Sequence, residues 1–177
     1  LQNVIIQNGL ITNPKELGIK ASNISAITLS NLTFFDVNEA IAFDQVKLGL
    51  IKDIISKNNT NTTGKIVSLT ACNNICFDKL DLSHNILKRT AATNLPNIGV
   101  IVIVGSHDVK LRNSKIKNNV CQDAFRFAPF VFAQGTDLKI VNTVFENNGS
   151  TSPTSDDVSA AFILSASEVV IRNSSFN

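Results

Sequence analysis

The sequence predicts an all-β chain that winds into a solenoid of short parallel strands, and two observations lead to this prediction. A nine-position repeat returns seven times along the 177 residues, with apolar residues at its first and sixth positions and usually asparagine at its third and ninth. Around the copies the apolar residues alternate with a period of two, which is typical of β-strands, and no helical stripe is sustained. A repeat of this length indicates a chain whose successive turns stack on one another.

Three columns of apolar residues are expected to line the interior of this solenoid. The copies begin at Leu1, Leu29, Leu50, Phe77, Leu111, Ile140 and Ile171. Their sixth positions are Ile6, Phe34, Ile55, Leu82, Ile116, Phe145 and Phe176. Two residues before the first position stand Ile27, Leu48, Ile75, Val109, Leu138 and Val169. The copies start 21 to 34 residues apart with no helix-length connection, which predicts about seven rungs of three short strands. Neighbouring rungs would lie about 4.8 Å apart.

Asparagine is expected to form the corners between strands. The third positions of the repeat are Asn3, Asn31, Lys52, Lys79, Asn113, Asn142 and Asn173. The ninth positions are Gly9, Val37, Asn58, Asn85, Asn119 and Asn148. A tight corner needs a residue that tolerates left-handed backbone angles, as asparagine and glycine do, and stacked amides can bond to one another. We therefore interpret these rows as structural rather than functional.

The repeat resembles that of the right-handed parallel β-helix proteins, the pectin-lyase-like superfamily, over essentially all 177 residues. In that family an asparagine row often separates the second and third strands of each rung, and Asn113, Asn142 and Asn173 match it. The apolar-x-x-Asn element, as in Phe145 to Asn148, also resembles half of the repeat of polymorphic outer-membrane adhesins, whose companion Gly-Gly-Ala-Ile element is absent. The resemblance implies a right-handed parallel β-helix, the fold class predicted here.

Residues 1–177 are interpreted as one domain, an uncapped segment of a longer solenoid, because both ends interrupt a copy of the repeat. The formal charge is +2, from 16 basic and 14 acidic residues scattered singly, and Trp and Tyr are absent, which argues against nucleic-acid binding. No apolar run reaches the length of a membrane span. Cys72, Cys76 and Cys121 are odd in number, so both a Cys72–Cys76 disulfide and free thiols stay open.

Loops are expected to gather on one side, because the insertions at 10–20, 59–67, 86–98, 120–128 and 149–158 all follow the ninth position of the repeat. The strand after these loops is apolar, as at 100–104, 130–133 and 161–164. If Ile103, Phe132 and Ile163 point inward, the residues pointing outward are Val102, Val104, Val131, Phe162 and Leu164, and with the opposite parity the outer face is apolar as well. Such an apolar strip would be covered partly by loops and partly by a partner. A polyuronate-cleaving groove of the family would carry Asp, Lys and Arg there.

Four aspartates are the candidate binding residues. Asp108 and Asp137 share one column with Glu168, three residues before the repeat, and Lys110 and Lys139 stand two residues further on. Such a column could hold a cation, although neutralising Lys–Asp pairs are the favoured arrangement. Asp156 and Asp157 are adjacent in a loop and resemble one element of the polygalacturonase pattern, whose other elements are absent. His84 and His107 have no nucleophile in register, so we predict no catalytic residue, no metal and no cofactor.

Six asparagines head glycosylation triplets, and they are Asn23, Asn31, Asn58, Asn61, Asn148 and Asn173. The first functional hypothesis is a non-catalytic segment of an extracellular or cell-surface protein, such as an adhesin passenger, a fibre or a filament subunit. It would bind a carbohydrate or protein partner, or assemble with itself, through the loop side and the apolar strip. The alternatives are a polysaccharide lyase or glycoside hydrolase, and a phage-type tail spike.

Overall fold

The computed structural model is all-β, with parallel sheets and no helix in the part of the chain that it describes, residues 2–13, 17–88, 99–122, 126–150, 158–159, 162–165 and 168–177. One sheet contains β1 (Asn3–Thr12), β3 (Ala26–Phe35), β5 (Gly49–Lys57), β8 (Asn73–Ser83), β11 (His107–Arg112), β15 (Asp137–Val141) and β20 (Glu168–Arg172), with β12 (Lys115–Lys117), β16 (Val144–Glu146) and β21 (Ser175–Phe176) continuing it. We call this sheet A.

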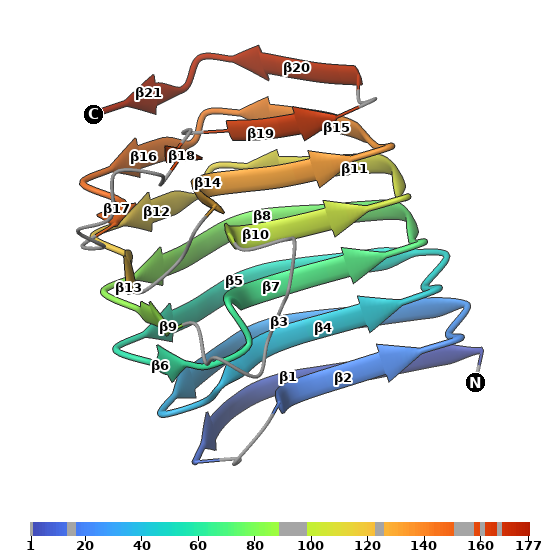
Figure 1. The fold of residues 1–177 in the computed structure, drawn as a ribbon. Coiled ribbons are helices and arrows are strands. Elements are labelled where there is room, and N and C mark those ends of the chain that lie inside the picture. The colour runs from blue at the N-terminus through green and yellow to red at the C-terminus, as the bar shows by residue number, and fades with distance from the viewer. Residues whose placement is uncertain are drawn as a thin grey trace.

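Sheet B contains β2 (Leu17–Ser22), β4 (Glu39–Asp44), β7 (Lys65–Thr70), β10 (Gly99–Val104), β14 (Arg126–Gln134), β18 (Val158–Ser159) and β19 (Phe162–Ser165). Sheet C contains β6 (Thr60–Asn61), β9 (Ile86–Lys88), β13 (Val120–Gln122) and β17 (Gly149–Ser150). The chain alternates between sheets A and B, with a strand in sheet C between them from β6 onward, and returns one strand further along each time, so that its two ends lie at opposite ends of the stack (Figure 1). We call each such round a pass.

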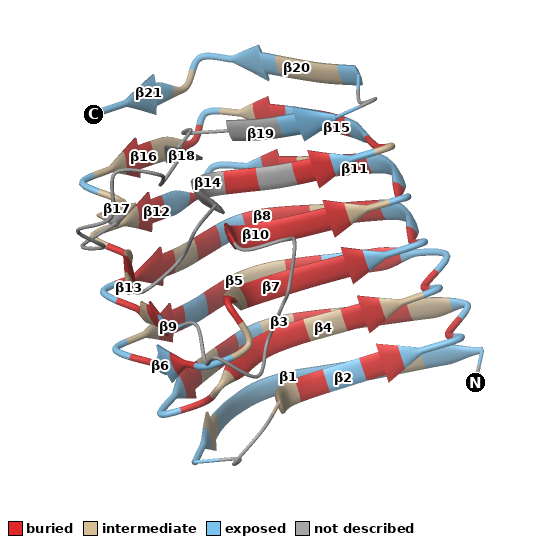
Figure 2. Cartoon of the chain, viewed as in Figure 1, coloured by how far each residue is buried: buried red, intermediate tan, exposed pale blue. Residues whose placement is uncertain are grey.

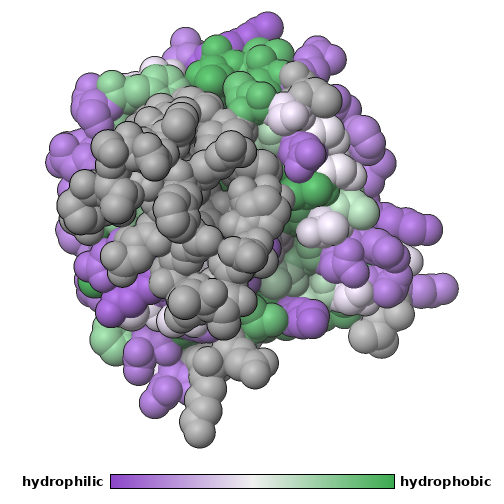
Figure 3. All heavy atoms as spheres, viewed as in Figure 1, coloured by the Kyte–Doolittle hydropathy of each residue, from purple (hydrophilic) through white to green (hydrophobic). Residues whose placement is uncertain are grey.

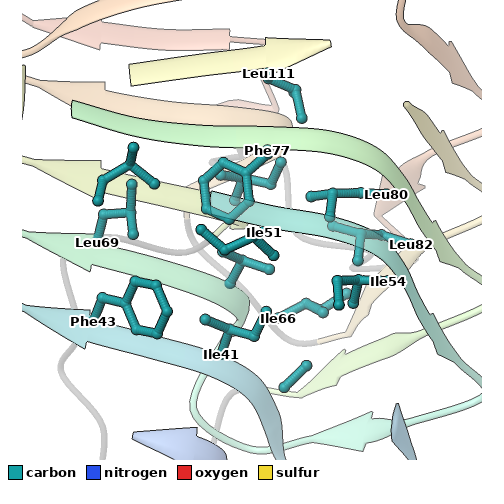
Figure 4. Close-up of a cluster of buried hydrophobic side chains, with 14 of the residues drawn as sticks. Ile41, Phe43, Ile51, Ile54, Ile66, Leu69, Phe77, Leu80, Leu82 and Leu111 are labelled. Carbon is teal, nitrogen blue, oxygen red and sulfur yellow. The ribbon is translucent and has the colours of Figure 1, made fainter. Parts of the chain in front are cut away.

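The apolar columns form the interior between sheets A and B. In sheet A the strands align Ile6, Leu29, Ile51, Phe77, Leu111, Ile140 and Ile171. In Figure 4 the side chains of Ile51 and Phe77 point toward those of Ile41, Phe43 and Leu69 from sheet B. Buried residues are concentrated in the middle strands, whereas β1, β20 and β21 are largely exposed (Figure 2). The middle of the stack therefore has the most complete core.

The predicted register was wrong in two of the seven copies. Leu50 is 40% exposed and Ile51 is fully buried, so the third copy begins one residue later than predicted. The first copy begins at Ile6, which pairs with Leu29, and not at Leu1, which lies outside the described residues. In the third pass the corner explains the shift, because Asp53 and not Lys52 has a left-handed backbone, with φ of 53°.

With the corrected register, two small residues occupy interior positions of the third pass. Leu48 and Ile55, predicted to be inside, are exposed, and Gly49 and Ser56 occupy their interior positions. A Cβ atom on Gly49 would lie 2.8 Å from Cδ1 of Ile75, so the position has room only for glycine unless its neighbour moves. Ser56 is buried, and its hydroxyl accepts a hydrogen bond from Nδ2 of Asn59 at 2.9 Å. Polar and small residues can therefore interrupt an otherwise apolar column.

Left-handed residues form three rows of corners among the described residues, where two were predicted, and in the ninth-position row the left-handed residue is the one before Val37, Asn85, Asn119 and Asn148. The first row is Asn8, Asn31, Asp53, Lys79, Asn113, Asn142 and Asn173, all with φ between 50° and 60°. A second row is Asn13, Asp36, Asn58, His84, Asn118 and Asn147, and a third is Asn23, Gln45, Ala71, Gly105 and Gly135. Five members of the predicted third-position row are confirmed as corners, while Asn3 and Lys52 give way to Asn8 and Asp53 with the corrected register.

A ladder of buried amides lies just inside the second row of corners. Nδ2 of Asn59 donates to Oδ1 of Asn85 at 2.9 Å, Nδ2 of Asn85 to Oδ1 of Asn119 at 2.9 Å, and Nδ2 of Asn119 to Oδ1 of Asn148 at 2.8 Å. Each acceptor oxygen also receives the backbone N–H of the preceding member, at 3.0 to 3.1 Å. Three residues of the predicted ninth-position row, Asn85, Asn119 and Asn148, therefore belong to this ladder. In the third pass the ladder residue is Asn59, one residue after the predicted Asn58.

The predicted apolar strip on sheet B is confirmed at some positions and wrong at others: Leu164 is 45% exposed and Val104 is half-buried, whereas Val102 and Val131 are buried. Val131 was predicted to point outward, but it is fully buried in the core and pairs with Ile101. The register between β10 and β14 shifts by one residue after Gly99, and this irregularity reverses the parity read from the sequence. Val102 is only 2% exposed. The side chains of Phe132, Phe162 and Ile163 lie outside the description.

Candidate functional site

The acidic column predicted from the sequence exists at the edge of sheet A where its strands begin. Asp137 pairs with Glu168, and Asp108, which has a left-handed backbone with φ of 49°, directly precedes Val109, the partner of Leu138. All three carboxylates are exposed. Together with Lys139 they line a surface pocket of about 220 Å³. The described residues therefore offer a row of hydrogen-bond acceptors, one on each of three successive passes.

Basic side chains neutralise part of this row. Nζ of Lys110 lies 3.1 Å from Oδ1 of Asp108, which confirms the predicted pairing of these two residues. Asp137 has a different partner from the one expected, because its Oδ2 lies 3.2 Å from Nδ1 of His107. Both pairs are solvent-exposed and contribute little to stability, about 0 to 1 kcal/mol each. Their carboxylates are accessible to hydroxyl, amide or cationic groups of a ligand.

The described residues contain no cluster of three His, Cys, Asp or Glu side chains that could hold a metal ion. The column is spread along the stack, and its members alternate with Lys110, Lys139 and His107, so it does not converge on one point. Asp156 and Asp157, the other two predicted binding residues, lie outside the described residues. Of the predicted binding residues, the structure therefore describes only Asp108 and Asp137.

Sequence reasoning missed a second polar cluster, which is centred on Glu39 at the start of β4. Its side chain is only 5% exposed, and burial raises the pKa of its carboxyl group above the ordinary value of 4.5. The hydroxyl of Ser68 donates to Oε1, and the hydroxyl of Thr63 lies 3.4 Å from Oε2. The one signal in the sequence is an acidic residue directly before the apolar run Ala-Ile-Ala-Phe, which is too common to single out.

The asparagines of the glycosylation triplets differ in their accessibility. Asn23, Asn31, Asn58 and Asn173 are exposed, and glycosylation there stays a prediction. Asn61 is fully buried, and its amide binds the carbonyl oxygens of Asn38 and Lys65, so it offers no room for a glycan in the folded chain. Asn148 is the last residue of the amide ladder, and its Nδ2 donates to the carbonyl of Ile116 at 2.7 Å. A glycan on Asn148 would require breaking that bond.

No disulfide joins Cys72 to Cys76 in the structure, so of the two alternatives left open by the sequence the thiol form holds for these two residues. Cys72 and Cys121 are buried, and Cys76 is half-buried on sheet A. Burial raises the pKa of the Cys72 thiol, so its reactive thiolate form is disfavoured. Cys72 also donates to the carbonyl of Thr70 at 3.3 Å. Its environment is that of a packing residue.

The surface of the visible face is polar along its edges and apolar at its upper end, where the C-terminal strands lie (Figure 3). The strands β19, β20 and β21 each carry an exposed apolar side chain, namely Leu164, Ile171 and Phe176. Among the described residues we find no helix with the length and hydrophobicity needed to span a membrane. No protein-family model matches the chain, and no curated protein matches it either.

Proposed function

We propose that the chain is a segment of a right-handed parallel β-helix, with about seven coils, that acts as a non-catalytic scaffold in an extracellular or cell-surface protein. The observation that carries this proposal is the use of polar side chains at the corners. The four amides of the ladder bond to one another and to backbone groups, and Ser106, Ser114, Thr136 and Thr143 bond to backbone groups of their own or neighbouring passes. These side chains serve stacking and not a reaction.

A scaffold of this kind binds through what projects from it, and the row around Asp108 and Asp137 is the best candidate surface. Its carboxylates come from three successive strands, whose backbones lie about 4.8 Å apart, and such a row suits an extended ligand with repeated hydroxyl groups. The mixture of carboxylates with Lys110 and His107 favours a neutral glycan or a polar protein surface over a polyanion.

The test combines a binding assay with an assay of chain cleavage. We expect neutral cello-, xylo- or manno-oligosaccharides to bind without being shortened, and Asp137→Asn to weaken binding by about tenfold, as expected for the loss of one charged hydrogen bond. Asp53→Asn is the matched control, because Asp53, whose side chain is 43% exposed, lies on another pass and has the left-handed backbone that asparagine tolerates. Equal affinity of the two variants would refute the proposed binding surface.

A carbohydrate-active enzyme is the second candidate, because Glu39 is a buried carboxyl group with a raised pKa, a combination that catalytic acids often show. The assay above separates the candidates when it also includes polygalacturonate and alginate. Shortening of any of these chains by the purified protein, abolished by Glu39→Gln, would replace the scaffold proposal with the enzymatic one.

A further inference from the structure

The turn between β6 and β7, residues 61–65, is attached to the neighbouring pass by buried polar groups. Nδ2 of Asn61 donates to the carbonyl oxygens of Asn38 and Lys65, and its Oδ1 accepts from the backbone N–H of Gly64 at 2.7 Å. Oδ1 of Asn38 accepts from the backbone N–H of Thr62 at 2.6 Å. The turn therefore lies against the residue that precedes β4.

The carboxyl group of Glu39 takes part in the same attachment. Its Oε1 accepts from the hydroxyl of Ser68 on β7, and its Oε2 lies 3.4 Å from the hydroxyl oxygen of Thr63, whose own proton also has the carbonyl oxygen of Lys65 within 3.4 Å. The charged groups that act on it, among the described residues, are the ammonium groups of Lys65 at the start of β7 and Lys20 on β2. Neither lysine forms an ion pair with Glu39 in this part of the chain, so a negative charge there would be nearly buried and without a direct counter-ion.

We propose that Glu39 is a pH-sensitive latch, in which the protonated carboxyl group holds the turn at 61–65 against β4 and ionisation loosens it. A protonated carboxyl group has both a donor and an acceptor, and the hydroxyls of Thr63 and Ser68 can complement either. An ionised carboxylate at the same place needs water, because a buried charge without a partner is costly. Opening of the turn would admit that water. The latch is independent of the proposed function.

The direction of the pH dependence follows from the cause of the pKa shift. Burial raises the pKa of Glu39 above 4.5, and the opposing effects of Ser68, Lys65 and Thr63 are smaller. The folded chain therefore keeps this proton at pH values where the unfolded chain has lost it. The contribution to stability is complete below a pH of about 4.5 and declines as the pH rises through the raised pKa.

Hydrogen exchange of the whole chain, measured by mass spectrometry between about pH 4 and pH 8 and corrected for intrinsic exchange rates, tests the latch. We expect the amides of residues 61–65 to lose protection several-fold as the pH rises, and the amides of β11 to keep theirs. Glu39→Gln, which is always neutral and keeps an acceptor for Ser68, should stay protected throughout. Glu146→Gln is the matched control, because it removes the same charge from an ion pair with Lys117 away from the turn.

Two results would overturn the latch, namely uniform protection of the turn at all pH values in the unaltered protein, or the same pH dependence in Glu39→Gln. A carbon-13 NMR titration of the glutamate carboxyl groups provides an independent measurement. The spectrum of Glu39→Gln identifies the signal of Glu39, because that signal is missing from it. In the unaltered protein this signal should titrate with a pKa above 4.5, which is the ordinary value for glutamate. If Glu39→Gln does not fold, the exchange of the unaltered protein decides alone.

Discussion

The Asn119→Ala variant is expected to lose about 3 kcal/mol of its free energy of unfolding. Oδ1 of Asn119 accepts from the backbone N–H of Asn85 at 3.1 Å and from its Nδ2 at 2.9 Å. Nδ2 of Asn119 donates to the carbonyl of Leu82 at 3.0 Å and to Oδ1 of Asn148 at 2.8 Å. Alanine removes all four bonds and leaves their buried partners unsatisfied, each at a cost of about 1 to 3 kcal/mol before relaxation. Equilibrium unfolding in urea measures the loss.

The control for this variant is Asn142→Gly on the outer row of corners. Asn142 is exposed, its Nδ2 makes one long bond of 3.3 Å to Oδ1 of Asn113, and its φ is 51°. Glycine tolerates that backbone angle, so the variant should be destabilised by less than about 1 kcal/mol. If the two variants lose the same stability, the buried ladder has no special role.

The second large effect is expected from adjacent residues of β5. Ile51→Ala should lower the free energy of unfolding by about 3 kcal/mol, because Ile51 is fully buried between Leu29 and Phe77 and alanine leaves a cavity. Leu50→Ala should cost less than about 1 kcal/mol, because Leu50 is 40% exposed on the outer face.

Thermal or urea unfolding of the two alanine variants side by side measures this difference. The pair isolates the orientation of one strand, since the side chains are isomers and differ only in the face that they occupy. A larger loss at Leu50 than at Ile51 would mean that β5 has the register first predicted from the sequence. It would also return Lys52 to the corner now assigned to Asp53.

The all-β fold with parallel strands and most of the core residues could be predicted from the sequence, because the repeat shows which positions are apolar. Leu29, Phe77, Leu111 and Ile140 are buried and aligned as expected. The third copy was misplaced because the sequence Leu-Gly-Leu-Ile-Lys-Asp-Ile-Ile offers apolar residues in two registers. Pattern alone cannot choose between them. The choice is made by the corner at Asp53 and by the tight contact at Gly49.

The outer face of sheet B shows a different limit of sequence reasoning. A single irregularity between β10 and β14 moves Val131 from the outer face to the core, since one extra residue reverses every later side chain. The one mark of that position in the sequence is Pro129, which lies between Ala128 and Val131, because proline within a sheet occurs mainly at edges and bulges. In a strand that is apolar at every position, the sequence indicates burial but not direction.

The acidic row and the cluster around Glu39 also differ in how far they could be predicted from the sequence. The acidic row was predictable because Asp108, Asp137 and Glu168 keep a constant distance from the repeat. Glu39 has no counterpart in neighbouring copies, and the groups that bury it, Thr63 and Ser68, come from elsewhere in the chain. A site made by one unusual residue is visible only when the strands are placed side by side.

The amide ladder also gives the stack an electrical direction. The side-chain oxygen of each amide accepts from the preceding pass, and one N–H each of Asn59, Asn85 and Asn119 donates to the next, so these bonds run in one direction along the stack, as peptide hydrogen bonds do along a helix. Hydrogen bonds in such a chain polarise one another, by about 10 to 30% per bond. A substitution at a central amide therefore weakens its neighbours as well as itself, and the two terminal amides are the places where sequence change is best tolerated.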